Sequence, residues 1–120
     1  MMNPRNSPDP DTAFRQRVHA WAIKMRVKPK QVRLQKMTRK WASYSANGRV
    51  TFSVALLEEA HAFQEYVIVH ELLHLKVPNH GKLFKSLLSA FLPRWREAIK
   101  LPRTRFDVMD PDSVAEFEQD

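Results

Sequence analysis

Three histidines and one glutamate are spaced as in metal-dependent hydrolases. In His70-Glu71-Leu72-Leu73-His74 the two histidines are four residues apart, which places both imidazoles on one face of a helix, about one turn apart. That spacing lets both rings bind one zinc ion, and a catalytic zinc takes three protein ligands and keeps one position open. His80 is the candidate third ligand. Glu71 is the candidate general base, because it lies beside the first ligand without being needed as a ligand itself.

The helix that carries this motif is predicted to be buried. Residues 66–69 read Tyr-Val-Ile-Val, and leucines follow at positions 72, 73 and 75, so that apolar side chains surround the helix almost completely. A helix of this kind lies inside a protein, where ionisable side chains are costly unless they are paired or bind a metal. The context therefore favours a metal site over a chance pattern on a solvated surface.

Pro78 determines how the third histidine reaches the other two. We expect the metal-binding helix over about residues 62–76, because Pro78 forces an end at or before Val77. Asn79 is the candidate cap of a second helix over about residues 81–91, whose apolar residues fall on one face. The chain reverses between the two helices, and this brings His80 back to the rim of the first.

The elements before the motif are predicted to be one helix and a small sheet. Thr12 is the candidate N-cap of a helix over about residues 13–25, which a Lys-Pro-Lys sequence at 28–30 follows. Short strands are expected near residues 32–37, 41–45 and 49–53, and the Asn47-Gly48 turn predicts a hairpin between the last two. After the motif, a short helix is expected from Pro93 to Ile99.

These elements predict an α+β fold. A small three-stranded, mostly antiparallel sheet packs on the metal-binding helix, with one N-terminal helix and one or two C-terminal helices. Residues 1–11 are predicted to be a disordered lead, residues 12–105 a zinc metallopeptidase domain, and residues 106–120 an acidic, flexible tail.

Length and composition limit the class of protein. A chain of 120 residues suits one domain with one core. It has no cysteine, which excludes thiolate zinc sites, disulfides and thiol catalysis and is compatible with a reducing compartment. No apolar run approaches the roughly 20 residues of a membrane span, and the N-terminus lacks the apolar core of a signal peptide. We therefore predict a cytoplasmic protein with no membrane partner, whereas the oligomeric state is left open.

Charge is distributed unevenly along the chain. All 20 Lys and Arg lie at or before Arg105, and residues 107–120 hold six acids and no base. Residues 12–57 hold eleven bases and no acid. Such a segment suits DNA, an acidic partner or the acidic tail itself, which could cover the cleft and keep an enzyme latent; a solvated basic surface is the plain alternative.

The run from His70 to Phe84 resembles the YgjP-like metallopeptidase domain, which is similar to the SprT and Spartan zinc proteases. In those proteases the third zinc histidine also begins a His-Gly-x-x-Phe run, as residues 80–84 do here. Residues 38–45 resemble the strand core of the family, and Leu-Pro-Arg-Trp-Arg at 92–96 resembles a later motif, so the likeness covers about residues 12–100. Ala42 stands where the family usually has Gly, and Tyr44 where it usually has Cys.

The resemblance implies a minimal zincin-like fold and a peptidase that binds one Zn²⁺ through His70, His74 and His80 and acts on peptide or protein substrates. It also implies a sheet edge beside the metal helix, to which an extended substrate adds as a strand. Several side chains are candidates for contacts with substrate or nucleic acid: Trp41, Tyr44, Arg49 and Arg94.

Two alternatives stay open. One is a Spartan-like, DNA-associated protease, because aromatic residues including Trp21 and Trp41 lie among the bases and could stack on unpaired nucleotides; core packing is the competing interpretation. The other is a non-catalytic, zinc-stabilised module that binds nucleic acid or protein.

Two further roles have candidates without a clear signal. A second electrophile for the reaction could be Tyr66, His61 or Arg94, although each also has an ordinary structural interpretation. A partner for the outer N–H of a metal-bound imidazole could be a backbone carbonyl, Glu97 or Ser86.

Overall fold

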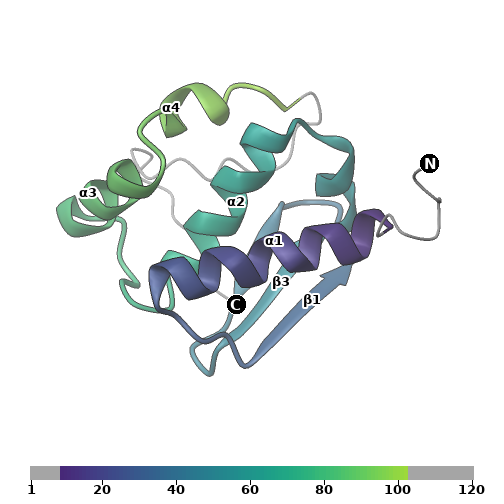
Figure 1. Ribbon diagram of the computed structural model, residues 1–120, viewed down its shortest axis with the longest axis horizontal. Helices are drawn as coiled ribbons and strands as arrows, with labels where there is room; N and C mark the ends of the chain where they lie inside the picture. Colours follow the sequence, from purple (N-terminus) through teal and green to yellow (C-terminus); the bar gives the residue numbers. More distant parts are fainter. Residues whose placement is uncertain (1–8, 103–120) are drawn as a thin grey trace, which may run out of the picture.

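Four α-helices, one 3-10 helix and three strands make up residues 9–102, the part of the chain that the computed structural model describes (Figure 1). In chain order the elements are α1 (Pro10–Met25), β1 (Gln31–Gln35), β2 (Ala42–Tyr44), β3 (Arg49–Ser53), η2 (Val54–Glu58), α2 (His61–Leu73), α3 (Lys82–Phe91) and α4 (Trp95–Ala98). Residues 1–8 of the predicted lead and the predicted acidic tail lie outside the described residues.

Helix α1 begins earlier than predicted. The side chain of Asp9 accepts a hydrogen bond from the backbone N–H of Thr12 at 2.7 Å, so Asp9 is the N-cap and Pro10 the first helical residue. Proline suits that position, because the N–H that it lacks would have no partner in the first turn. The choice of Thr12 as the cap was therefore wrong: Asp and Thr both cap helices, and the following proline favours the aspartate. The helix ends before Arg26, whose backbone is left-handed with φ 60°.

The three strands form a mixed sheet in the order β1-β3-β2. β2 and β3 make the predicted hairpin, with Ala42 opposite Phe52 and Gly48 in the turn at φ 99°. β1 pairs with β3 in parallel, Val32 lying opposite Val50. The expectation of a mostly antiparallel sheet thus holds for one of the two pairings. The chain reverses direction twice between β1 and β3, so these strands run the same way, and β3 takes the central position.

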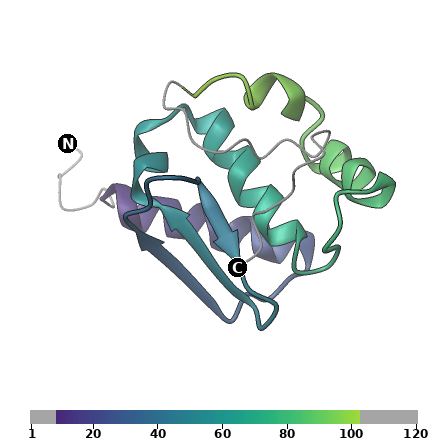
Figure 2. The same ribbon diagram turned by 180° about the vertical axis from the view of Figure 1, so that it is seen from behind.

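Helix α2 lies at the centre of the molecule, where it contacts α1, β2, α3 and α4. The sheet lies behind α1 in Figure 1 and in front of it in Figure 2, so α1 covers one face of the sheet, and α2 runs beside the β2 edge. Ten of the 13 residues of α2 are buried. This confirms the prediction of a buried helix, because a helix enclosed on all sides needs apolar residues all round.

Most ends of the later helices differ from the prediction by one to three residues, whereas α3 ends at Phe91 as predicted. Helix α2 ends at Leu73, and the turn that follows contains tighter bonds, from Leu75 N–H to Leu72 C=O and from Lys76 N–H to Leu73 C=O. Such i to i+3 bonds commonly close the last turn of a helix. Gly81, not Asn79, is the N-cap of α3, and it makes no side-chain hydrogen bond. Among residues 9–102, no helix is both long enough and apolar enough to cross a membrane.

Candidate active site

The three predicted metal-binding histidines converge on one point. Nε2 of His80 lies 3.2 Å from Nε2 of His70 and 2.9 Å from Nε2 of His74. All three side chains are buried, and their ligand atoms lie within 4.8 Å of one another. His74 caps α2 but keeps helical angles (φ −61°, ψ −21°), so it stays one turn from His70 on the same face of the helix.

This arrangement fits a metal ion better than a set of hydrogen bonds. A neutral imidazole carries one N–H, so Nε2 of His80 cannot donate to both neighbouring Nε2 atoms. A shared cation removes the conflict, since all three nitrogens then act as ligands. In tetrahedral coordination, Zn–N bonds of 2.0–2.1 Å separate the nitrogens by about 3.3 Å, which is close to the two separations observed. Among the described residues, the group contains these three histidines and no carboxylate.

The turn after α2 returns His80 to the other histidines. Val77 N–H bonds to the carbonyl of Leu73 at 2.8 Å, which closes the helix, and Pro78 prevents its continuation. The chain then reverses, and α3 starts directly after Gly81. The predicted reversal at Pro78 is thus observed, with His80 in the loop that precedes α3.

Phe84 of α3 packs against all three imidazoles. Its ring centroid lies 5.2 Å from that of His70, 4.8 Å from that of His74 and 4.8 Å from that of His80. The side chain is completely buried. The phenylalanine that ends the His-Gly-x-x-Phe run therefore provides the apolar support on which all three rings rest.

Tyr66 contacts the edge of the His70 ring that faces away from the point where the three histidines converge. Its phenol oxygen lies 3.0 Å from Nδ1 of His70, on the opposite edge of the ring from the shared point. With Nε2 given to a metal, a neutral His70 carries its proton on Nδ1 and donates it to the phenol. Tyr66 thus takes the orienting role for which Glu97 and Ser86 were the candidates. The four-residue spacing of Tyr66 and His70 on one helix is the signal that would have found it.

Tyr44 stacks on His74. The two ring centroids are 4.6 Å apart and the ring planes differ by 9°. Tyr44 is buried at the end of β2, and this contact joins the sheet to the end of the metal helix. The residue was predicted to contact substrate or nucleic acid; the structure gives it a contact with a candidate metal ligand.

The other predicted contacts lie away from the histidines or inside the core. Trp41 is buried and packs edge-on against Phe63 at 5.1 Å. Arg49 is exposed at the start of β3 and donates to the side chain of Gln31. His61 is the first residue of α2, nine residues before His70, which corresponds to about 13 Å along the helix axis.

Arg94 and Glu97 pair with each other on the surface. The guanidinium of Arg94 donates to the carboxylate of Glu97 at 2.6 Å, and both side chains are largely exposed. This hydrogen bond lowers the pKa of Glu97 and raises that of Arg94. Ser86, on α3, is also exposed. The pairing leaves neither Arg94 nor Glu97 directed at the histidines.

Glu71 is completely buried, next to His70 in the centre of α2. Burial of a carboxylate costs free energy unless a charge or hydrogen bonds offset it. The buried second half of α2, residues 66–73, thus carries Glu71 directly beside His70 among mostly apolar residues. Together with a fold of this kind, such a site defines the class of metal-dependent peptidases.

The family follows from the sequence match. Residues 10–101 match the model described as the YgjP-like metallopeptidase domain, and the chain therefore belongs to the YgjP-like metallopeptidase family. It is a metallopeptidase with a three-histidine site. No curated protein sequence matches the chain significantly.

Two solved structures share the fold. One is the metallopeptidase zymogen of Pyrococcus abyssi abylysin, with a TM-score of 0.65, 22% identity, and coverage of 72% of this chain and 89% of that chain. The other is the metallopeptidase zymogen of Methanocaldococcus jannaschii jannalysin, with a TM-score of 0.64, 23% identity, and coverage of 71% of this chain and 88% of that chain. They support the α+β fold described above.

Proposed function

We propose that the protein is a zinc-dependent peptidase in which His70, His74 and His80 hold one Zn²⁺ and Glu71 is the general base. The observation that carries the proposal is the approach of His80 Nε2 to the Nε2 atoms of both helical histidines, at 3.2 and 2.9 Å. The absence of a carboxylate from this group, within residues 9–102, is compatible with the open coordination position of a catalytic zinc.

The zinc would supply a Lewis acid that polarises the scissile carbonyl and lowers the pKa of water to about 7. Glu71 takes the proton of the attacking water and delivers it to the leaving amine. His70 is held in its ligand tautomer by Tyr66, and His74 is held by its stack on Tyr44. The peptide would lie extended along β2, because β2 ends the sheet order and contacts α2.

The DNA-associated alternative has less support. Trp21 donates its indole N–H to Glu65 and packs on Phe91, and Trp41 packs on Phe63. Nucleotide stacking requires exposed aromatic faces, whereas Trp41 is buried and Trp21 is half-buried, with Lys24 lying over its ring. The non-catalytic module is disfavoured by the lack of a fourth ligand among the described residues and by the presence of Glu71. A cytoplasmic location remains a prediction from the absence of cysteine.

Glu71→Gln tests the proposal. We expect zinc to stay bound at one ion per chain, measured by mass spectrometry of the metal, while hydrolysis of an unstructured protein such as casein falls by about 10²- to 10⁴-fold. Glu58→Gln, at an exposed position in η2, is the matched control and should leave hydrolysis unchanged. Undiminished hydrolysis by Glu71→Gln with zinc bound would exclude Glu71 as the base.

A further inference from the structure

A groove opens beside the candidate metal site, at the His74 end of α2. Its walls come from three segments: residues 26–30 between α1 and β1, the hairpin residues 44–48, and residues 74–78 after α2. Figures 1 and 2 show these segments at the same lower end of the molecule. The groove has a volume of about 620 Å³, and Tyr44 and His74 line its inner part. It therefore starts at a candidate metal ligand and leads outward.

Among residues 9–102, the charged side chains that line the groove are all positive. Arg26, Lys28, Lys30 and Lys76 line it, all four are exposed, and no acidic residue of this described part of the chain contributes to the lining. The ion pairs found among the described residues, Arg15 with Asp11 and Arg94 with Glu97, involve none of these four cations. Four like charges around one concave space raise the local potential and attract anionic groups.

The walls are held by contacts within the chain. The backbone N–H of Lys30 bonds to the carbonyl of Gly48 at 2.8 Å, which joins the α1–β1 connection to the hairpin. Gly48 has φ 99°, and a side chain at this position would meet Cγ of Lys30 at 3.1 Å. Lys76 donates to the carbonyl of Met25 at 3.2 Å, which joins the end of α2 to the end of α1. These contacts hold the three walls of the groove together.

We infer that this groove is a subsite for the acidic side chains of a peptide substrate. The inference rests on the proposed peptidase function and names the substrate class: chains with Asp or Glu a few residues to one side of the scissile bond. The volume lies in the range of about 300–1,000 Å³ that is usual for ligand sites. A peptide bound at the metal would continue past His74 into the groove, where its carboxylates meet Lys28 and Lys30.

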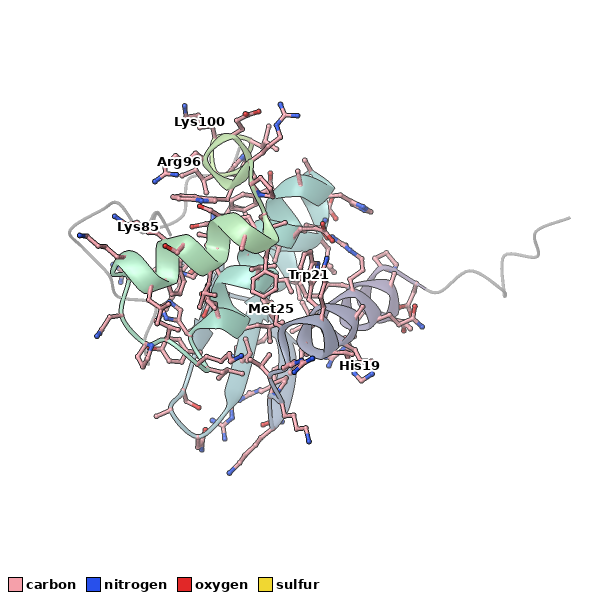
Figure 3. The ribbon with its side chains drawn as sticks, turned by 60° about the vertical axis from the view of Figure 1, so that its left-hand side comes forward. His19, Trp21, Met25, Lys85, Arg96 and Lys100 are labelled. Carbon is pink, nitrogen blue, oxygen red and sulfur yellow. The ribbon has the colours of Figure 1, made fainter. Side chains whose placement is uncertain are left out.

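The groove suits an acidic peptide better than single-stranded nucleic acid. Sequence-independent binding of unpaired strands combines cations with aromatic faces on which bases stack. Within residues 9–102, the lining holds no Trp or Phe, and its tyrosine, Tyr44, has its ring stacked on His74. Trp21 does not line the groove and lies on the side of α1 that faces the other helices, as Figure 3 shows for Trp21 and Met25.

The experiment compares two peptides that differ only in charge. A fluorescent peptide with a glutamate cluster on one side of the cleavable bond, and a second with the cluster on the other side, are each paired with a glutamine version. We expect one of the two glutamate peptides to bind and be cleaved about fivefold better than its glutamine version, and the preference to vanish in about 1 M salt, because the Debye length then falls to about 3 Å.

The variants locate the preference. Lys28→Gln with Lys30→Gln should abolish it, and glutamine retains the Cβ and Cγ of Lys30 that lie against Gly48. Lys36→Gln with Lys100→Gln is the matched control: Lys36 follows β1 at the end opposite Lys30, Lys100 lies beyond α4 (Figure 3), and neither lines the groove. This control should keep the full preference. Thermal unfolding of both double variants checks that they fold.

Binding and cleavage separate the two proposals. Fluorescence anisotropy of the metal-free protein measures peptide binding by the groove, separately from cleavage. A preference for glutamate peptides in this binding assay, together with no cleavage by the zinc-loaded protein, would support the groove and count against the peptidase. Cleavage of glutamate and glutamine peptides at equal rates would overturn the groove inference and leave the peptidase intact. Loss of the glutamate preference to the same extent in both double variants would also overturn the groove inference and leave the peptidase proposal intact. Binding of single-stranded DNA that Lys28→Gln with Lys30→Gln removes, without any glutamate preference, would assign the groove to nucleic acid.

Discussion

The phenol oxygen of Tyr66 lies 3.0 Å from Nδ1 of His70, one helical turn further along α2. The Tyr66 ring itself is fixed, since it is completely buried and stacked against Trp95 with centroids 6.2 Å apart. When Nε2 of His70 binds a metal, the ring proton lies on Nδ1, and the rigid phenol of Tyr66 accepts it. The contact therefore joins the core of the protein to the candidate metal site.

Tyr66→Phe should weaken zinc binding by about 10- to 100-fold, because it removes the partner of Nδ1 and keeps the packing of the ring. The measurement is competition for zinc against a chelator of known affinity. Tyr44→Phe removes a phenol from the other side of the site and is the matched control, for which we expect a smaller change. Equal zinc affinity of Tyr66→Phe and the unaltered protein would contradict the orienting role.

The stack of Tyr44 on His74 gives a second prediction. Tyr44→Phe retains an aromatic ring at 4.6 Å from His74, whereas Tyr44→Leu removes it. Both lose the hydroxyl, so their difference isolates the ring contact. We expect Tyr44→Leu to be less stable than Tyr44→Phe by about 0.5–1.5 kcal/mol and to bind zinc more weakly, measured by chemical unfolding and chelator competition. Identical behaviour of the two variants would show that the stack contributes nothing.

The core of the site could be predicted from sequence because its geometry is local. His70, Glu71 and His74 lie on one helix, whose period determines their relative directions. Pro78 limits the helix and thereby places His80 near it. The apolar residues around the motif predicted burial correctly. Each of these features depends on residues that are separated in the sequence by less than about three helical turns.

The features that were missed depend on distant parts of the chain. The parallel pairing of β1 with β3 depends on which strand takes the centre of the sheet, and strand patterns do not specify neighbours. The Tyr44 stack joins residues 30 positions apart and depends on how β2 packs on α2. The cations of the groove come from two segments that are distant in sequence, residues 26–30 and Lys76, so the basic sequence from 12 to 57 indicated charge but not its concentration beside His74.

Phe84 supports all three histidines, and its removal should affect both stability and metal binding. Phe84→Ala leaves a cavity in a fully buried position and should lower the free energy of unfolding by about 3–5 kcal/mol. Zinc affinity should fall as well, because the three imidazoles lose a common contact. Leu83→Ala is the control: the side chain is 60% exposed, and we expect a change within about 0.5 kcal/mol. Chemical unfolding of the metal-free and zinc-loaded proteins measures both effects.

The Asp9 cap predicts a pH dependence of stability. Two hydrogen bonds from Thr12 lower the pKa of Asp9 below its ordinary value: the bond from the backbone N–H has the larger effect, and the bond from the side chain adds to it. A carboxylate whose pKa is lower in the folded chain stabilises the fold above its unfolded pKa of about 3.9, and this contribution is lost as the pH falls through the folded pKa. Asp9→Ala should therefore lower the melting temperature at pH 7, and its difference from the unaltered protein should shrink below about pH 4.

Asp9→Asn separates the hydrogen bond from the charge. Asparagine still offers an oxygen to the Thr12 N–H, but its side chain does not titrate. The difference in melting temperature between Asp9→Ala and Asp9→Asn should consequently stay constant with pH. The difference between Asp9→Ala and the unaltered protein should instead become smaller as the carboxylate is protonated. Thermal unfolding of the metal-free proteins, at several pH values from 7 downward, avoids the loss of zinc that acid would cause. The difference in melting temperature between Asp9→Ala and the unaltered protein could instead stay constant down to the pH at which the chain unfolds. That result would show that the charge of Asp9 does not contribute to the cap.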